Sequence, residues 1–556
     1  MDICTVIIEE IIRRKIKTLD KALKVRQEIC KKYKSKEFPS IRKILLSAKP
    51  SQLARLRFLQ TKPVRTISGV APVAVMTKPF PCPHGKCTIC PGGPESVFGN
   101  TPQSYTGYEP ATRRGIRNFF DPYLQVFNRL EHYVLLNHSI DKAELIIMGG
   151  TFPSTHAKYQ NRFVEQCLKA MNDFGALFFR NNQLNIKKFK EFFMLPHDLG
   201  DENTIRQIQR KILKLKLKNR MSLKNEQKRN ENAKVKCVAL CIETRPDYGK
   251  LKEGNQMLKL GCTRVELGIQ SVYDDVLKNI ERGHSVKESI ESIRILKNLG
   301  FKISAHYMIG LPGSSKKKDI EGFKQLFENP DFRPDMLKIY PCVVVKGTKL
   351  YKMWKNGRYK PLSAKEAAET IAEMKKYVPE YCRIQRIQRD IAENFIEAGP
   401  KMSNLRQYIH ENFDVKCRCI RCREPKGLAI SIKGIKINIH EYEASEGKEF
   451  FVSAESPNDK LVGFCRMRFP SQFLRKEITS GTAIIRELHV YGKSTALGET
   501  GKVQHRGLGK KLLKKCEEIA KKHNKDKIAI ISGIGVRSYY RKLGYKKQGP
   551  YMVKAL

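Results

Sequence analysis

The stretch Pro81-Cys82-Pro83-His84-Gly85-Lys86-Cys87-Thr88-Ile89-Cys90 brings three cysteines together on one short segment. A closed structural zinc or iron–sulfur site takes four protein ligands. Three thiolates on a 4Fe-4S cluster leave one iron open, where S-adenosylmethionine (SAM) can bind and be split into a radical. The alternative is a zinc knuckle with a distant fourth ligand. The number of thiols therefore predicts a metal site and favours the open cluster.

Short apolar runs alternate with helical patterns after this segment. The runs are 143–149, 237–242, 264–269, 302–310 and 336–340, and the helical patterns include 122–136, 205–224, 274–280 and 286–299. Alternation of this kind predicts a parallel sheet with crossover helices. The number of units favours an α/β fold with a partial, open (βα) barrel, in which chemistry takes place at the carboxyl ends of the strands.

Several predicted strands end in glycine or polar residues that a packed core does not need. These residues are Gly149, Gly150, Glu243, Arg245 and Gln270. Glycines allow a ligand to approach the backbone closely. We expect the polar side chains to bind the amino, carboxylate and ribose groups of SAM, although ordinary turn chemistry explains any one of them taken alone.

A second cysteine group, Cys417, Cys419 and Cys422, lies in a connector between the barrel and the C-terminal part of the chain. Thiolates at this spacing predict a structural zinc site, with Cys382, His410 or His440 as alternatives for the fourth ligand. The competing interpretation is a basic loop with free thiols.

The C-terminal part has a different pattern, of strands followed by a glycine turn and a helix. A hairpin is predicted over 449–469 around residues 457–459, and a further strand over 482–491. Gln504, Gly507 and Gly509 then open a helix over 510–523. Backbone N–H groups at such a helix start bind pyrophosphate, and the spacing is that of the coenzyme A loop of acetyltransferases. The fold expected here is an α+β GNAT-type acetyltransferase domain.

The chain carries a large positive charge, which predicts a polyanionic partner. The net charge is +50 over 556 residues. Residues 1–66, whose pattern is helical, hold 18 Lys and Arg against 6 Asp and Glu, and residues 203–236 hold 12 against 2. Nucleic acid is the commonest large polyanion, whereas a solvated charged face is the plainer explanation. No apolar stretch is long enough for a membrane span, and the 16 cysteines without a signal peptide predict a reducing, cytoplasmic location.

The barrel and the acetyltransferase pattern in one chain resemble the catalytic subunit of Elongator and its standalone relatives. The resemblance runs from about residue 60 to the end. It includes the segments 104–110, 147–152, 243–247, 487–492 and 549–554. It implies a radical SAM enzyme that installs a carboxymethyl group on C5 of the wobble uridine of tRNA, with acetyl-CoA as co-substrate.

The resemblance also implies residue roles. Cys82, Cys87 and Cys90 would bind the cluster. The positions that match acetyl-CoA contacts are Lys142, Glu487, Leu488, His489, Val490, Leu508, Gly509, Lys510 and Tyr540. Of these, Lys142, Tyr540 and Glu487 are the catalytic candidates, with Glu487 positioning the water that hydrolyses the thioester. Lys142 lies in the barrel half, so its match implies that the two halves share the thioester.

The predicted organisation is a basic helical tRNA-binding region at 1–66, a radical SAM barrel at 67–380, a cysteine-containing linker at 381–427 and a GNAT domain at 428–556. The anticodon loop of tRNA and an electron donor are the expected partners, and a homodimer or accessory subunits stay open. Two alternatives remain: a protein lysine acetyltransferase that keeps the cluster for structure, and a non-catalytic RNA-binding subunit. Cleavage of SAM separates the first proposal from both.

Overall fold

The structure is a computed structural model of the full chain. It describes residues 2–35, 38–61, 66, 68–181, 183–196, 201–426, 434–491 and 507–556. Gln504, expected in the coenzyme A loop, lies outside these residues.

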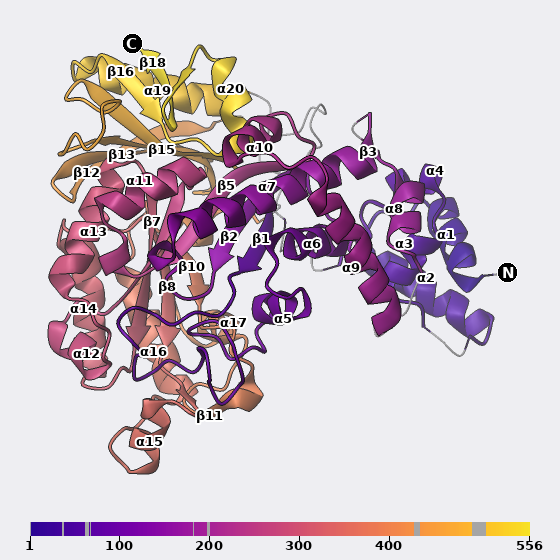
Figure 1. Cartoon of the computed structure of the whole chain (residues 1–556), viewed down its shortest axis with the longest axis horizontal. Coiled ribbons are helices and arrows are strands. Elements are labelled where there is room, and N and C mark those ends of the chain that lie inside the picture. Colours follow the sequence, from indigo (N-terminus) through magenta and orange to yellow (C-terminus); the bar gives the residue numbers. More distant parts are fainter. Residues whose placement is uncertain are drawn as a thin grey trace.

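The N-terminal residues form a small helical unit, as their pattern predicts. Its helices are α1 (Ile3–Arg13), α2 (Leu19–Lys32), α3 (Ile41–Ser47) and α4 (Pro50–Leu53), followed by a turn of 3-10 helix, η1 (Ala54–Leu56). Ile7, Ile11, Val25 and Ile44 are buried in a core of their own. Basic residues between the apolar positions leave the outside of the unit positively charged. Figure 1 shows this unit at one side of the molecule, beside α8 (Ile186–Phe192).

The central sheet confirms the predicted open barrel. Its strands are β1 (Ala71–Met76), β2 (Lys142–Met148), β5 (Lys236–Thr244), β6 (Arg264–Gln270), β7 (Lys302–Ile309), β8 (Met336–Pro341) and β10 (Arg383–Ile387). Neighbouring strands are parallel and follow chain order from β1 to β10. All carboxyl ends therefore meet at one end of the barrel.

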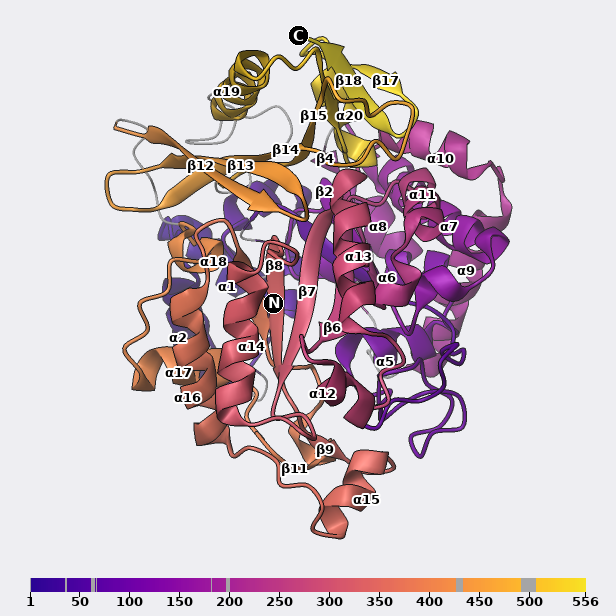
Figure 2. The same cartoon turned by 90° about the vertical axis from the view of Figure 1, so that its left-hand side faces the viewer.

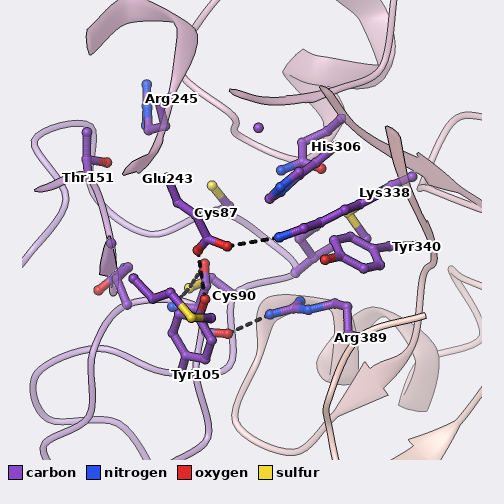
Figure 3. Close-up of a pocket in the computed structure, with 18 of the residues that line it drawn as sticks. Cys87, Cys90, Tyr105, Thr151, Glu243, Arg245, His306, Lys338, Tyr340 and Arg389 are labelled. Carbon is purple, nitrogen blue, oxygen red and sulfur yellow. Dashed lines mark hydrogen bonds and ion pairs between the residues drawn. The ribbon is translucent and has the colours of Figure 1, made fainter. Parts of the chain in front are cut away.

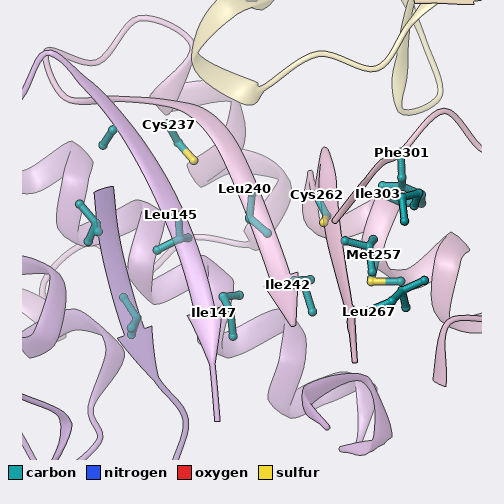
Figure 4. Close-up of a cluster of buried hydrophobic side chains, with 14 of the residues drawn as sticks. Leu145, Ile147, Cys237, Leu240, Ile242, Met257, Cys262, Leu267, Phe301 and Ile303 are labelled. Carbon is teal, nitrogen blue, oxygen red and sulfur yellow. The ribbon is translucent and has the colours of Figure 1, made fainter. Parts of the chain in front are cut away.

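Helices cover the outer face of this sheet. They include α6 (Pro122–Leu135), α7 (Ala157–Phe178), α11 (Leu251–Leu260), α12 (Asp274–Asn279), α13 (Val286–Asn298), α14 (Lys316–Glu328) and α16 (Ala364–Met374). Strand residues such as Leu145, Ile147, Leu240 and Ile242 pack beneath them (Figure 4). The helix expected over 205–224 is two helices, α9 (Glu202–Leu217) and α10 (Leu223–Asn230), because the Ser222 hydroxyl caps a new helix start by accepting from the Asn225 N–H.

The C-terminal sheet has the order β12-β13-β14-β15-β16-β18-β17. Its strands are β12 (Lys436–Ala444), β13 (Gly447–Glu455), β14 (Leu461–Phe469), β15 (Thr482–Val490), β16 (Lys527–Ile530), β17 (Lys546–Gln548) and β18 (Tyr551–Ala555). The helices α19 (Leu508–Lys522) and α20 (Arg537–Arg541) pack on it. The predicted hairpin is β13–β14, paired antiparallel, so this expectation is confirmed.

The C-terminal sheet sits on the amino ends of the barrel strands, at the opposite end of the molecule from β11 (Ile396–Ala398) and α15 (Lys349–Lys355) (Figures 1 and 2). Asp335, directly before β8, binds Arg486 of β15 through two contacts of 2.6 and 2.7 Å. Arg486 also binds Glu449 at 2.8 Å, and Glu449 binds Arg468 at 3.0 Å. All four side chains are at most 1% exposed. Buried charges of this kind are tolerated only when each keeps its charged partners, because an unpaired buried charge strongly destabilises the fold.

We therefore expect Asp335→Asn to destabilise the protein strongly. The substitution leaves the Arg486 guanidinium buried with Glu449 but without the charge of Asp335. Removing one partner of a comparable buried ion pair lowers the free energy of unfolding by about 3–5 kcal/mol. Denaturant unfolding of the purified protein measures the loss. The control is Asp275→Asn, which removes a 2.5 Å ion pair whose Asp275 side chain is 62% exposed, and which should change stability by less than about 1 kcal/mol. Equal effects of the two variants would contradict the assigned role of the buried pair.

Candidate functional site

The cysteine segment lies on the long loop that follows β1. The thiols of Cys82, Cys87 and Cys90 are 8%, 7% and 5% exposed and line one cavity of about 160 Å³. The cavity lies at the carboxyl ends of β2, β5, β6, β7, β8 and β10, because residues at these ends make up its wall (Figure 3). This is the position that the barrel pattern predicts for a reactive site.

Positive and N–H groups face these sulfurs. The Arg282 guanidinium lies 3.5 Å and the His84 Nε2 3.1 Å from the Cys87 sulfur, and the Ser104 N–H donates to the Cys90 sulfur at 3.2 Å. Burial raises the pKa of the Cys82 and Cys90 thiols. Thiolates at these positions therefore need a bound cation to stabilise them, as a metal cluster does.

The distances between their sulfur atoms distinguish the two groups of cysteines. Among described residues, the ligand atoms of Cys417, Cys419 and Cys422 all lie within 4.8 Å of one another, whereas those of the loop cysteines do not form such a group. A single tetrahedral zinc ion with bonds of about 2.3 Å draws its sulfurs close together. Ligands on three different irons of a cluster stand farther apart. The loop cysteines fit a cluster, and the connector cysteines fit one ion.

The predicted SAM-binding residues lie around the same cavity, with one exception. Gly150, Glu243, Arg245 and Gln270 line it, whereas Gly149 packs beside Thr77, whose hydroxyl a side chain there would overlap. Gln270 has a left-handed backbone, φ 67°, rare outside glycine. Its buried Oε1 has no partner among the described residues.

Arg245 and Glu243 are already partly bound. Arg245 makes two 2.9 Å contacts with Asp247, and its buried Nη1 has no described partner. Glu243 accepts from the Tyr105 hydroxyl at 2.9 Å and binds the Lys338 amine at 3.1 Å. The free Arg245 and Gln270 atoms fit a polar ligand, while Glu243 is held by protein groups. Buried polar atoms without partners are costly unless a ligand or water binds them.

Sequence reasoning did not find a charged column inside the barrel. Lys338 binds Glu266, Glu266 binds Arg264 at 3.1 Å, and Arg264 binds Glu144 at 2.7 Å. Although burial alone raises the pKa of Glu266, Lys338 and Arg264 hold it well below its usual range. Small barrels are usually filled by apolar side chains. Charged residues at alternate positions of otherwise apolar runs, as in Arg264-Val265-Glu266, were the available signal.

Glu243, Glu266 and His306 also lie within ligand distance of one another. The Lys338 amine binds both carboxylates, so a protein cation already occupies the position of a metal. Burial and the charge of Lys338 lower the pKa of His306, which is therefore neutral at pH 7. This set acts as part of the column rather than as a metal site.

A second candidate ligand-binding site, or cradle, lies at the other end of the barrel, where β15 ends and α19 begins. β15 pairs with β16 only from Thr482 to Ile485, so Glu487, Leu488, His489 and Val490 separate from β16. Gly507 caps α19 in a left-handed conformation, φ 82°, and among the described residues no side chain caps the N–H groups at the start of this helix, Leu508, Gly509 and Lys510. A side chain at Gly509 would contact Tyr539, Val490 and Leu488. This opening and helix start fit a pantetheine arm and a pyrophosphate.

The three catalytic candidates have different surroundings. Lys302 and Arg466 bind Glu487 at 2.6 and 2.9 Å and, against the effect of burial, lower its pKa to about 2. Tyr540 is 6% exposed in the core of the domain, whereas Tyr539 is 36% exposed. Lys142 begins β2 and lies beside Lys236 of β5. Glu487 is therefore a fixed anion at neutral pH.

The C-terminal domain closes over the end of the barrel where Lys142 lies. The helical turn η7 (Ile534–Val536) packs against β5, and any side chain at Gly533 would overlap the Val238 carbonyl oxygen. β2 extends from Lys142 at this end to Met148 at the cysteine cavity, a span of about 20 Å for seven residues. The residues predicted for the cysteine cavity and those predicted for the acetyltransferase site thus lie at opposite ends of one barrel.

The connector cysteines lie beside two of the three candidate fourth ligands. The Cys382 carbonyl accepts from the Ile420 N–H at 2.9 Å, within the segment that holds Cys419 and Cys422. His410 Nε2 lies 2.9 Å from the amine of Lys375, and both groups interact electrostatically with Cys419. His440 packs against the rings of Tyr381 and Tyr442.

Comparison with protein families matches four successive segments of the chain. Residues 1–67 match the ELP3 N-terminal domain, residues 81–326 the Radical SAM superfamily, residues 334–414 the Radical_SAM C-terminal domain and residues 424–545 the Acetyltransferase (GNAT) family. In the described residues no helix is both long and apolar enough to cross a bilayer.

Similar proteins match over nearly the full chain. A protein of Methanocaldococcus infernus named tRNA uridine(34) acetyltransferase is 49% identical over 90% of this chain and 88% of its own. Elongator complex protein 3 of Homo sapiens is 39% identical over 92% of this chain and 89% of its own. The solved structure of the archaeal M. infernus Elp3 lacking residues 1–46 has a TM-score of 0.71 at 43% identity, and covers 88% of this chain and 100% of that one.

Proposed function

The chain belongs to the Elongator complex protein 3 (Elp3) family, and on that basis we propose that it carboxymethylates C5 of the wobble uridine of tRNA from SAM and acetyl-CoA. The proposal rests on two candidate ligand-binding sites, or cradles, on one barrel. One is a cavity with three buried thiols, and the other is the separated β15–β16 pair with its open helix start. Either cradle alone fits other reactions.

The residues of the cavity fit an open cluster and SAM. Cys82, Cys87 and Cys90 would bind the cluster, while Arg245 and Gln270 offer the unpaired Nη1 and Oε1 atoms to SAM. When bound, these cofactors supply a radical that can take a hydrogen atom from the acetyl methyl group. Arg282 and the Ser104 N–H stabilise the thiolates by charge and hydrogen bonding, which sets the electron affinity of such a site.

The other cradle would bind acetyl-CoA by its pyrophosphate and pantetheine arm. The N–H groups at Leu508, Gly509 and Lys510 would meet the pyrophosphate, and Leu488 to Val490 the arm. Glu487 cannot act as a base while its pKa is near 2, so we assign it to fixing Lys302 and Arg466 and to orienting a water by hydrogen bonding. Lys142 and Tyr540 remain candidates for thioester contact.

The acetyl group must travel from one end of the barrel to the other in this proposal. The column Glu144–Arg264–Glu266–Lys338 lines the interior between the two ends. A polar interior accepts a thioester carbonyl and a later carboxylate better than a packed apolar core does, because both need hydrogen-bond donors. Exclusion of bulk water from such an interior protects radical intermediates.

A protein lysine acetyltransferase needs its acetyl group exposed to a peptide. Here η7 of the acetyltransferase domain packs on β5 of the barrel, and Lys302 of the barrel binds Glu487 of the cradle. These contacts favour delivery of the acetyl group into the barrel over delivery to a protein. A non-catalytic RNA-binding subunit would need neither cradle. The basic helical region at 1–66 and the +50 net charge support tRNA as the substrate, and a cytoplasmic location with a separate electron donor fits that substrate.

The experiment is mass analysis of the wobble uridine after tRNA is incubated with reduced protein, SAM and acetyl-CoA. We expect a carboxymethyl addition that needs both co-substrates. Cys87→Ala should abolish it together with about four irons per chain, whereas Cys516→Ala, in the core of the acetyltransferase domain, should keep both. Acetylation of lysine without SAM consumption would contradict the proposal.

We also propose a structural zinc ion at Cys417, Cys419 and Cys422, with His410 as its fourth ligand. His410 interacts with Cys419 through space and lies on α17 (Leu405–Asn412), which packs on α16 of the barrel. The ion would join the linker to the barrel, since metal binding contributes to folding.

Cys419→Ser should therefore release about one zinc per chain and lower the melting temperature, while the iron content stays unchanged. His410→Ala should weaken zinc binding in a chelator competition, and Cys382→Ala should leave it as in the wild type. Full zinc content in Cys419→Ser would rule out this site. Zinc loss in Cys382→Ala but not in His410→Ala would show that the fourth ligand is wrongly assigned.

A further inference from the structure

Three aromatic rings, Phe98, Tyr108 and Phe395, are in contact beside the cysteine cavity. Tyr108 lies parallel to Phe395, with ring centroids 4.2 Å apart and an interplanar angle of 28°. Phe98 meets Phe395 edge to face at 5.7 Å. Two of the rings come from the cysteine loop and the third from the segment after β10. Tyr108 is 50% exposed, so the stack ends in a ring that solvent can reach.

The backbone around Tyr108 is fixed in place. The buried Glu109 carboxylate accepts from the Thr106 N–H at 2.8 Å and from the Gly107 N–H at 3.2 Å. Gly107 has a left-handed backbone, φ 94°, which turns the chain outward before the tyrosine. The ring is therefore presented in one orientation, and a partner that binds it loses little ordering entropy.

The rings adjoin the wall of the cavity, because Glu109, the residue after Tyr108, lines it. Ser104, whose N–H donates to the Cys90 sulfur, is four residues before Tyr108, so their Cα atoms are at most about 14 Å apart. Arg389 donates to the Ser104 carbonyl and lines the cavity. Ile391 lines it too and packs with Phe98 and Phe395. Tyr108 therefore lies next to residues of the cavity wall.

Packing in an apolar cluster explains the positions of Phe98 and Phe395 but not that of Tyr108. Phe98 and Phe395 cover the small apolar cluster around Ile391 and Ile396. The Tyr108 side chain stays half exposed, and its hydroxyl makes no hydrogen bond to a described residue. Arg386 and Arg389 line the adjoining wall. A flat ring with an open face beside cationic groups fits an anionic ligand with flat rings of its own.

We propose that Tyr108 is a stacking platform for an unpaired nucleobase of the RNA next to the uridine that enters the cavity. This inference rests on the proposed function, since that function supplies a single-stranded loop at the mouth. A base that must leave its stack to reach an enclosed site loses stacking energy. A platform for its neighbour restores part of that energy and keeps the loop open. Stacking on one ring accepts any base, so the platform positions the loop without reading its sequence.

The test measures binding of an anticodon stem-loop RNA at several salt concentrations. Tyr108→Ala should weaken binding about 5- to 150-fold, which corresponds to about 1–3 kcal/mol for one stacked base. Tyr108→Phe keeps the ring and should stay within about twofold of the wild type. The slope of log affinity against log salt should not change in either variant, because no phosphate contact is lost.

Two further variants separate base stacking from a loss of packing and from a general effect of exposed rings. Tyr108→Leu keeps an apolar cover on Phe395 and should weaken binding nearly as much as Tyr108→Ala, with iron content and melting temperature as checks of folding. Phe473→Ala removes a similarly exposed ring, 53%, on the acetyltransferase domain, and should bind as the wild type does.

A salt slope that falls by about 1 in Tyr108→Ala would overturn the platform in favour of a phosphate contact. Wild-type affinity in Tyr108→Ala and Tyr108→Leu would overturn it outright, as would equal loss in Tyr108→Phe. Failure of the wild-type protein to bind the stem-loop at all would instead overturn the proposed function, and the platform with it.

Discussion

The buried ion pair between Asp335 and Arg486 holds the acetyltransferase sheet against the barrel, and the arrangement of the two candidate sites depends on it. It joins the segment before β8 to β15 with two charge-assisted hydrogen bonds at 0% exposure. Because such a pair is costly when incomplete, the acetyltransferase sheet has one stable position, on the amino ends of the barrel strands. The cysteine cavity lies at the other end, at the carboxyl ends of the same strands.

The charged interior of the barrel follows from this arrangement. A barrel with a site at one end only can fill its centre with apolar side chains. This barrel has Arg264 and Glu266 at its centre, both at most 4% exposed, and each needs the other for its charge to be tolerated. Lys338 continues the column to Glu243 and Tyr105 at the cavity. Ion-paired side chains thus fill the interior between two chemically different sites, in place of a conventional apolar core.

The sequence predicted the individual elements and candidate sites better than it predicted their arrangement relative to one another. Strand and helix alternation gave the barrel, and the Pro457–Asp459 turn gave the β13–β14 hairpin, because both depend on local periodicity. The loop cysteines, Arg245 and Gln270 lie around one cavity, since carboxyl ends of parallel strands must meet. The distance between Lys142 and the cysteines was not predictable, because it depends on which end of the barrel the second domain covers. The roles of Glu487 and Glu243 depended on Lys302 and Lys338, which lie far away in the sequence.

The acetyl group bound at one end of the barrel must meet the radical generated at the other, and this meeting is the central claim. Acetyl-CoA deuterated on its methyl group tests it in a reaction with reduced protein, SAM and tRNA. We expect deuterium in the 5′-deoxyadenosine that is released, in proportion to the modified uridine formed. Modified uridine with no deuterium in 5′-deoxyadenosine would contradict it.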